Sequence, residues 1–219
     1  MQRDIFWITG QILRELGSAS SVATGRSREE SGEVNEEHNP YNVKIVNVVA
    51  VASIDQNIDL IAIMKTFRNV EYRPKRFPGL VFKLKQPKST TLIFRTGKMV
   101  CTGAKSEKIA KRAVNKVVRE LRNMGFIIRG KLKIKIVNMV ATADMGSMVD
   151  IEVMSDLLDN VMYEPEQFPG LIYKMYDPKV VILVFRSGKF VLTGATSEKH
   201  VHEAVEKIRS VLVENEFLY

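Results

Sequence analysis

The feature that most restricts the fold of this chain is an internal duplication with an offset of 91 residues. The segment Tyr72–Leu80 (YRPKRFPGL) returns as Tyr163–Leu171 (YEPEQFPGL), and the two units align without a gap. Between Tyr72 and Lys108, 21 of 37 positions are identical to their partners. A period of this length is too long for a solenoid repeat, so each unit is a small domain or half of a pseudo-symmetric one. We place the units at residues 43–133 and 134–219.

Each unit has the pattern of a strand, a short helix, several strands and a long helix. The alternating, β-branched segment Val43–Ser53 predicts a strand, and Asn57–Phe67 predicts a helix with Asn57 as its N-cap. Ser106 is expected to cap a long helix that ends near Met124, and Ser197 is its counterpart in the second unit. Further strands are predicted at Leu80–Leu84, Thr90–Phe94 and Met99–Gly103. The predicted class is α+β, an antiparallel sheet with helices on one face.

Strand alternation gives this sheet two apolar faces. Leu92 and Phe94 share one face and Ile93 points to the other, while Val100 and Thr102 share a face opposite Cys101. Two helices per unit can cover one face of a sheet formed by both units, but they cannot cover two. The second face therefore packs on the partner unit or on a dimer mate, or it is a binding surface.

The composition of the second face favours a binding surface. It would carry Val, Leu, Phe, Pro and Thr with one Asn per unit and almost no charge, inside a rim of Lys and Arg. A reader of the major groove would present Arg, Asn and Gln to base edges. An apolar face with a few hydrogen-bonding groups suits the minor groove of A·T-rich DNA, which offers mainly acceptors.

Three segments carry a resemblance to a known family: Lys75–Gly79 (KRFPG), Thr91–Lys98 (TLIFRTGK) and Met99–Ser106 (MVCTGAKS). They resemble the core of the TATA-box-binding proteins, in their archaeal form, and the resemblance covers about residues 43–217. It implies that both repeats form one curved antiparallel sheet, a saddle, with four helices on the convex face. It also implies a general transcription factor that binds the TATA box through the minor groove, bends it, and nucleates assembly with transcription factor B and RNA polymerase.

The resemblance assigns roles to matching positions. The intercalating side chains match Phe77, Phe94, Phe168 and Phe185. Minor-groove contacts match Asn47, Val49, Pro78, Leu92, Val100 and Thr102 in the first unit, and Asn138, Val140, Pro169, Leu183, Val191 and Thr193 in the second. Phosphate contacts match Arg76, Lys83, Lys98, Lys174 and Lys189. A flat apolar ring can replace stacking at a base step and hold a kink open.

Charge is distributed unequally between the units. Residues 43–133 hold 21 Lys and Arg against 5 Asp and Glu, whereas residues 134–219 hold 8 against 13. In the family, transcription factor B docks on the second repeat, where acidic residues matter, and the matching positions are Glu164 and Glu166. We hypothesise that the acidic half recruits a basic partner and the basic half supplies most of the attraction to phosphate. A solvated acidic surface without a partner is the alternative.

Other features restrict the function further. Cys101, the single cysteine, lies in an apolar stretch and is expected to be a buried side chain; His200 and His202 are expected to bind no metal. No cofactor, metal site, catalytic constellation or membrane span is predicted. Residues 1–42 have no partner in the duplication. Within them, Asp4–Leu16 has the spacing of a short amphipathic helix, and Ser18–Asn39 has a composition typical of disorder.

The alternative function is a saddle of the same fold that acts as a protein–protein or accessory nucleic-acid-binding module. A homodimer through the second face is a further possibility for the protein without DNA. The expected location is on the chromosome in an archaeal cytoplasm, or in the nucleus if the source is eukaryotic.

Overall fold

A computed structural model describes residues 41–219, which belong to one compact unit. The predictions for Asp4–Leu16 and Ser18–Asn39 lie outside the described residues.

The unit is built on one sheet of ten strands, in the order β2-β3-β4-β5-β1-β6-β10-β9-β8-β7, and every neighbouring pair is antiparallel. The strands of the first half are β1 (Lys44–Ser53), β2 (Val70–Glu71), β3 (Leu80–Leu84), β4 (Ser89–Ile93) and β5 (Lys98–Ala104). Those of the second half are β6 (Lys133–Asp144), β7 (Val161–Met162), β8 (Leu171–Tyr176), β9 (Lys179–Val184) and β10 (Lys189–Ala195). From one edge to the centre the strands are β2-β3-β4-β5-β1, and from the other edge their counterparts follow in the same order, β7-β8-β9-β10-β6. The predicted class and pseudo-symmetry are therefore confirmed. The halves join where β1 pairs with β6.

Four helices accompany the sheet in the described part of the chain: α2 (Leu60–Thr66), α3 (Glu107–Asn123), α4 (Ile151–Leu157) and α5 (Glu198–Glu214). Ser106 and Ser197 cap α3 and α5 as predicted, each accepting a hydrogen bond from a backbone N–H three residues later. The prediction of Asn57 as the cap of α2 is wrong. Asp59 is the cap, and its Oδ1 accepts hydrogen bonds from the backbone N–H groups of residues 61 and 62.

A tertiary contact explains why α2 is capped by Asp59 and not by Asn57. The backbone N–H of Ile58 donates to the carbonyl of Arg95 at 2.8 Å, and the side chain of Ile58 is buried. This pairing ties residue 58 to the β4–β5 hairpin, and the helix cap lies two residues after the predicted one, at Asp59. Asn and Asp are both good N-cap residues, so the local sequence does not show whether Asn57 or Asp59 caps the helix.

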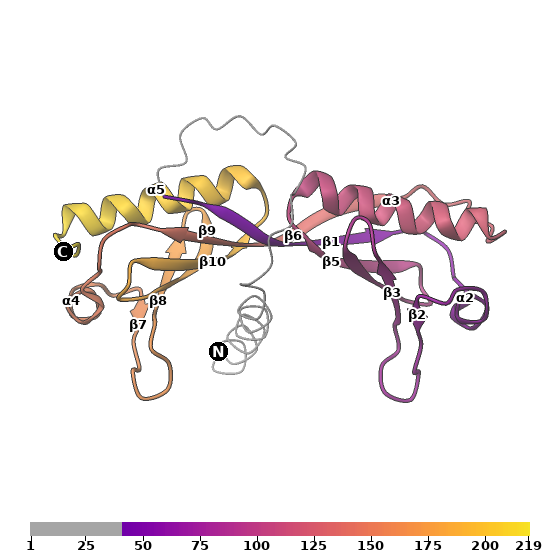
Figure 1. Cartoon of the computed structure of the whole chain (residues 1–219), viewed down its shortest axis with the longest axis horizontal. Helices are drawn as coiled ribbons and strands as arrows, with labels where there is room; N and C mark the ends of the chain where they lie inside the picture. Colours follow the sequence, from indigo (N-terminus) through magenta and orange to yellow (C-terminus); the bar gives the residue numbers. More distant parts are fainter. Residues whose placement is uncertain (1–40) are drawn as a thin grey trace, which may run out of the picture. The chain divides into compact units, whose positions relative to one another are not determined.

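Helices α3 and α5 lie along one face of the sheet, and α2 and α4 lie at its two ends (Figure 1). The core fills the space between α3, α5 and this face. Its largest members include Phe82, Ile93 and Met99 in the first half, and Phe190 in the second. Cys101 is fully buried there as predicted, and burial raises the pKa of its thiol.

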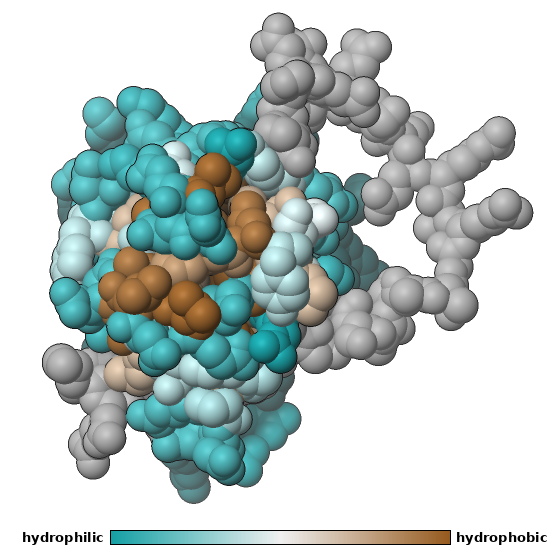
Figure 2. Space-filling view, turned by 90° about the vertical axis from the view of Figure 1, so that its left-hand side faces the viewer, coloured by the Kyte–Doolittle hydropathy of each residue, from teal (hydrophilic) through white to brown (hydrophobic). Residues whose placement is uncertain are grey.

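Two long loops extend on the side of the sheet away from α3 and α5 (Figure 1). One joins β2 to β3 and carries Phe77, and the other joins β7 to β8 and carries Phe168. At the end of the sheet that carries α4, Figure 2 shows hydrophobic residues gathered within a hydrophilic rim. The exposed large apolar side chains in this part of the chain include Met148, Val153 and Leu157.

Candidate nucleic-acid interface

Two pairs of phenylalanine rings are placed in the same way in the two halves. The rings of Phe77 and Phe94 lie with centroids 5.9 Å apart at an interplanar angle of 66°, and those of Phe168 and Phe185 lie 5.8 Å apart at 65°. In each pair one ring comes from the long loop and the other from the end of a hairpin. Phe77 is 40% exposed, so this ring is available to an outside surface. We call the two sets the first and second wedge pairs.

Local hydrogen bonds position both rings of a wedge pair. In the first loop the backbone N–H of Phe77 donates to the carbonyl of Arg73 at 3.0 Å, closing a turn. In the hairpin the N–H of Phe94 donates to the carbonyl of Lys98 at 2.9 Å. Phe168 and Phe185 make the corresponding bonds, to Glu164 and Lys189. These bonds fix the backbone from which each ring extends, and none of the four rings belongs to the core cluster under the helices.

The glycine that follows Phe-Pro has a role that sequence reasoning missed. A Cβ on Gly79 would lie 2.6 Å from Cε1 of Phe77 and 3.0 Å from Cε1 of Phe94. A Cβ on Gly170 would lie 2.7 Å from Phe168 and 3.0 Å from Phe185. Each ring pair rests directly on the glycine backbone, which explains the repeated Phe-Pro-Gly. The repetition of this tripeptide was the only signal in the sequence.

The predicted asparagines lie at the centre of the sheet, where the halves meet. Asn47 pairs with Val140 across β1 and β6, and Asn138 pairs with Val49 two rungs away. Each amide oxygen accepts a backbone hydrogen bond at 2.8 Å, from the N–H of Gly103 to Asn47 and from the N–H of Gly194 to Asn138.

These bonds fix the orientation of the amide groups. Only the oxygen of an Asn side chain can accept from an N–H, so the Nδ2 donor must lie on the other side of the amide. Thr102 Oγ1 donates to Asn47 Oδ1 at 3.2 Å, whereas Thr193 Oγ1 accepts from Asn138 Nδ2 at 3.3 Å and lies 3.4 Å from Asn138 Oδ1. Irregularities in strand register beside Gly103 and Gly194 turn the two N–H groups toward the amides. Both glycines have positive φ, at 93° and 100°, which other residues rarely adopt.

The predicted apolar contacts form matching rungs across the strands. In the first half Val51, Val100, Leu92 and Val81 are successive cross-strand partners, and in the second half Thr142, Val191, Leu183 and Ile172 are. They lie on the sheet face that points away from α3 and α5, which we call the second face. The rungs differ in exposure: Leu92 and Val100 are half-buried, whereas Leu183, Val191 and Val140 are buried, although none of the three belongs to the core cluster under the helices.

The predicted phosphate contacts surround the second face. Lys83 extends from β3, where Phe82 and Leu84 point to the core, and Lys98 and Lys189 begin β5 and β10. All are exposed except Lys174, which is half-buried. No salt bridge within residues 41–219 involves Arg76, Lys83, Lys98, Lys174 or Lys189. These cations are therefore available to an outside anion.

Glu164 and Glu166 lie on the second long loop, both exposed and without a salt bridge among the described residues. At the matching position of the first loop, Arg73 Nε pairs with Glu71 Oε1 at 2.8 Å. The loops thus have the same backbone and opposite charge.

The arrangement is that of a binding surface: two wedge pairs, apolar rungs between them, two oriented amides at the centre and cations at the rim. Within residues 41–219 no group of three or more His, Cys, Asp or Glu side chains is placed to hold a metal. None of the described helices is long and apolar enough to cross a membrane.

Comparison with known proteins gives one consistent family. The model of "Transcription factor TFIID (or TATA-binding protein, TBP)" matches residues 42–124 and again residues 133–215. The TATA-box-binding protein of Sulfurisphaera tokodaii is 52% identical over 177 residues, which cover 80% of this chain and 89% of the relative. That of Archaeoglobus fulgidus is 45% identical over 174 residues, covering 78% and 95%. The solved structure of "Methanococcus jannaschii TBP" is 47% identical with a TM-score of 0.73, and covers 78% of this chain and 98% of that one.

Proposed function

This chain belongs to the TATA-binding protein family of DNA-binding transcription factors, and we propose that it binds A·T-rich promoter duplex in the minor groove and bends it. The observation that supports the bend is the duplicated pair of wedges. Four rings lie in two edge-to-face pairs on hydrogen-bonded turns, outside the core and beside the same sheet face. Core packing alone would not place rings at both rims of one face.

Each wedge pair would act at one base step near an end of the site. Insertion of an apolar ring replaces part of the lost stacking, and TATA-binding proteins are themselves the standard example of such insertion. Unstacking costs a few kcal/mol per step, and pyrimidine–purine steps such as TA lower this cost. Sequence preference then arises with few hydrogen bonds to bases. The opened groove would cover the apolar rungs, and Pro78 and Pro169 would contact the groove beside the rings.

The central asparagines would read the middle of the site. The N–H groups of Gly103 and Gly194 hold both amide oxygens, which places the Nδ2 donors on the other side of the amides. Asn138 Nδ2 also donates to Thr193 Oγ1 at 3.3 Å, so its second N–H would be the one that meets a base. The minor groove of an A·T pair offers acceptors at A N3 and T O2, which match these donors. A G·C pair would place its N2 amino donor there instead. Asn47 and Asn138 therefore favour A·T pairs at the centre.

The acidic loop of the second half would recruit the next factor. Glu164 and Glu166 are exposed and carry no salt bridge among the described residues, so a basic partner could pair with both. We assign this partner as transcription factor B, through which RNA polymerase would join.

The repeats are assigned to residues 43–133 and 134–219, and the protein is expected to act on the chromosome.

The direct test is a gel shift on an A·T-rich TATA duplex and on a scrambled duplex of equal composition, with end-labelled fluorophores to report bending. Preferential binding accompanied by a shorter end-to-end distance is expected. Equal affinity for the two duplexes, or binding without a change in distance, would contradict the proposal.

A further inference from the structure

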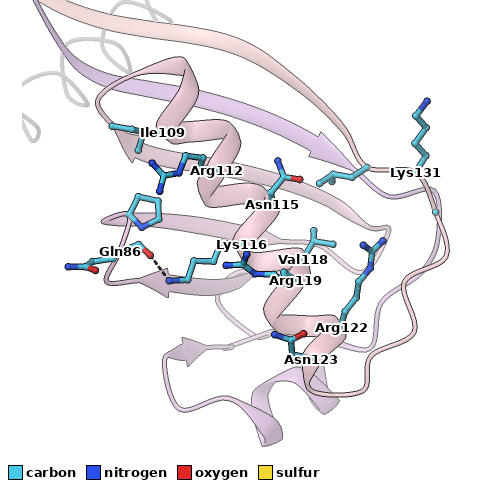
Figure 3. A pocket seen from close by; sticks show the side chains of 13 residues that line it. Gln86, Ile109, Arg112, Asn115, Lys116, Val118, Arg119, Arg122, Asn123 and Lys131 are labelled. Carbon is cyan, nitrogen blue, oxygen red and sulfur yellow. Dashed lines mark hydrogen bonds between the residues drawn. The ribbon is translucent and has the colours of Figure 1, made fainter. Parts of the chain in front are cut away.

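A groove of about 1060 Å³ lies along the outer side of α3, away from the second face (Figure 3). Its apolar floor includes Ile109, Val118 and Leu132. Its walls are α3, the β3–β4 turn at Gln86 and Pro87, and the segment just before β6. We call it the α3 groove.

The α3 groove is strongly basic. Five of its thirteen lining residues are Lys or Arg and none is Asp or Glu: Arg112, Lys116, Arg119, Arg122 and Lys131. None of the five forms a salt bridge within residues 41–219. Lys116 Nζ donates to the carbonyl of Gln86 at 2.7 Å, whereas the side chains of Arg112, Arg119 and Lys131 have no hydrogen-bond partner in the described part of the chain. Like charges held close together without counter-charges favour an anionic ligand.

The matching surface of α5 shows that the duplicated fold does not require this charge. The partners of Arg112, Arg119 and Arg122 are Glu203, Ser210 and Val213. Lys207, the partner of Lys116, is neutralised by Asp177 Oδ2 at 2.8 Å, and this hydrogen bond lowers the pKa of Asp177. The basic character of the α3 groove is therefore a property of the first half alone.

The spacing of the cations indicates the shape of the ligand. Arg112, Lys116, Arg119 and Arg122 lie at intervals of four, three and three residues, so they follow one side of the helix over about 15 Å. Figure 3 shows Arg112, Lys116 and Arg119 projecting from α3 beside the groove, with Lys131 on the connecting segment. A second helix with carboxylates at the same three- and four-residue intervals would match this row, and its apolar side chains would meet the floor.

We propose that the α3 groove is a docking site for an acidic amphipathic helix of another polypeptide. The groove lies on the helix side of the sheet, so the helix and a DNA duplex on the second face could be bound together. Docking would couple the basic half to a regulator or a further component of the transcription machinery. The inference does not depend on how DNA is bent.

The test uses the full chain and a fluorescent synthetic helix of about 20 residues, with Glu at three- and four-residue intervals on one side and Leu beside them. A second peptide has Gln for every Glu, and a third has Lys. Anisotropy titration is expected to show binding of the Glu peptide only. The double variant Arg112→Glu, Arg119→Glu should weaken it about tenfold or more, and should gain binding of the Lys peptide.

The matched control is Lys179→Glu, Lys199→Glu, which removes the same charge from exposed sites of the second half and should change affinity by less than about twofold. A TATA duplex should not displace the Glu peptide. Equal binding by the wild type and the α3 variant would overturn the proposal, as would binding of the Gln peptide at the same affinity. If the Arg variant instead loses binding of a non-TATA duplex while keeping the peptide, the groove is a nucleic-acid site and the proposal is wrong.

Discussion

The two halves of this protein share a backbone and differ in chemistry. The wedge pairs have nearly equal geometry, at 5.9 and 5.8 Å, and both central amides accept from a glycine N–H at 2.8 Å. The surfaces around them diverge: Arg73 faces the solvent where the second half has Glu164, and Arg112 lies where it has Glu203. The wedge pairs, the central amides and the rim cations Lys98 and Lys189 match between the halves, whereas the charges on the long loops and the long helices diverge.

The unequal charges give a nearly symmetric backbone two distinguishable ends. Two equal halves on a near-symmetric duplex would bind in either orientation, because the contacts of each orientation would be the same. Unequal charge at the loops and on the long helices distinguishes the two ends of the complex.

The largest effect is expected from removing one ring of each wedge pair with Phe94→Ala, Phe185→Ala. Losing the replacement for stacking at two steps should weaken TATA binding by about 100-fold or more and abolish bending. Gel shift and end-to-end fluorescence on the same duplex measure both. The single variants Phe94→Ala and Phe185→Ala should lose similar affinity to each other, since the two wedge pairs have the same geometry.

The control is thermal stability. Phe94 and Phe185 lie outside the core cluster, whereas Phe82→Ala in the core should cost about 3–5 kcal/mol. A comparable loss for the wedge variants would show that the rings are core residues and would contradict their role in DNA binding.

The next effect concerns the oriented amides. In Asn47→Asp or Asn138→Asp the backbone bond from the glycine is retained, but an anionic oxygen replaces Nδ2 and meets the acceptors of the groove. A charged group left without a partner costs about 1–3 kcal/mol or more, so each change should weaken A·T-rich binding by about 10- to 100-fold. The two variants should be equivalent in a gel shift. Loss confined to one of them would show that the halves read the site unequally.

A smaller effect should separate partner binding from DNA binding. Glu164→Lys, Glu166→Lys makes the second loop basic, as the first is, and should weaken recruitment of transcription factor B to a preformed DNA complex by about tenfold. Affinity for DNA alone should change little. The matched control is Arg73→Glu, Lys75→Glu in the first loop, which should leave recruitment intact. Equal loss of recruitment and DNA binding in the first variant would rule out this division of roles.

The smallest effect is expected at the matched rim cations Lys98 and Lys189. Each change to Gln should reduce the slope of log affinity against log salt by up to about 0.9, the value for one phosphate contact. Titrations between 50 and 200 mM salt would measure it. Arg76→Gln should behave likewise, and would copy the second half, where Gln167 already occupies the matching position. An unchanged slope would show that the residue in question does not contact phosphate.

The amino-acid sequence alone determined the features that rest on local periodicity and on repetition. The offset of 91 residues fixed two equal halves, and strand alternation separated Leu92 and Phe94 from Ile93. The helix caps at Ser106 and Ser197 and the unequal charge of the halves are also visible in the sequence. The family and the fold class follow from these features, and both were confirmed.

The tertiary structure alone decided the contacts between residues far apart in the chain. Periodicity gives the faces of a strand but not its neighbours, so the pairing of β1 with β6 that brings Asn47 and Asn138 to the centre was not predictable. The bond from Gly103 to Asn47 spans 56 residues, and a Cβ on Gly79 would crowd two rings that come from different loops. Such contacts depend on which distant segments the fold brings together, and local side-chain patterns do not predict that arrangement.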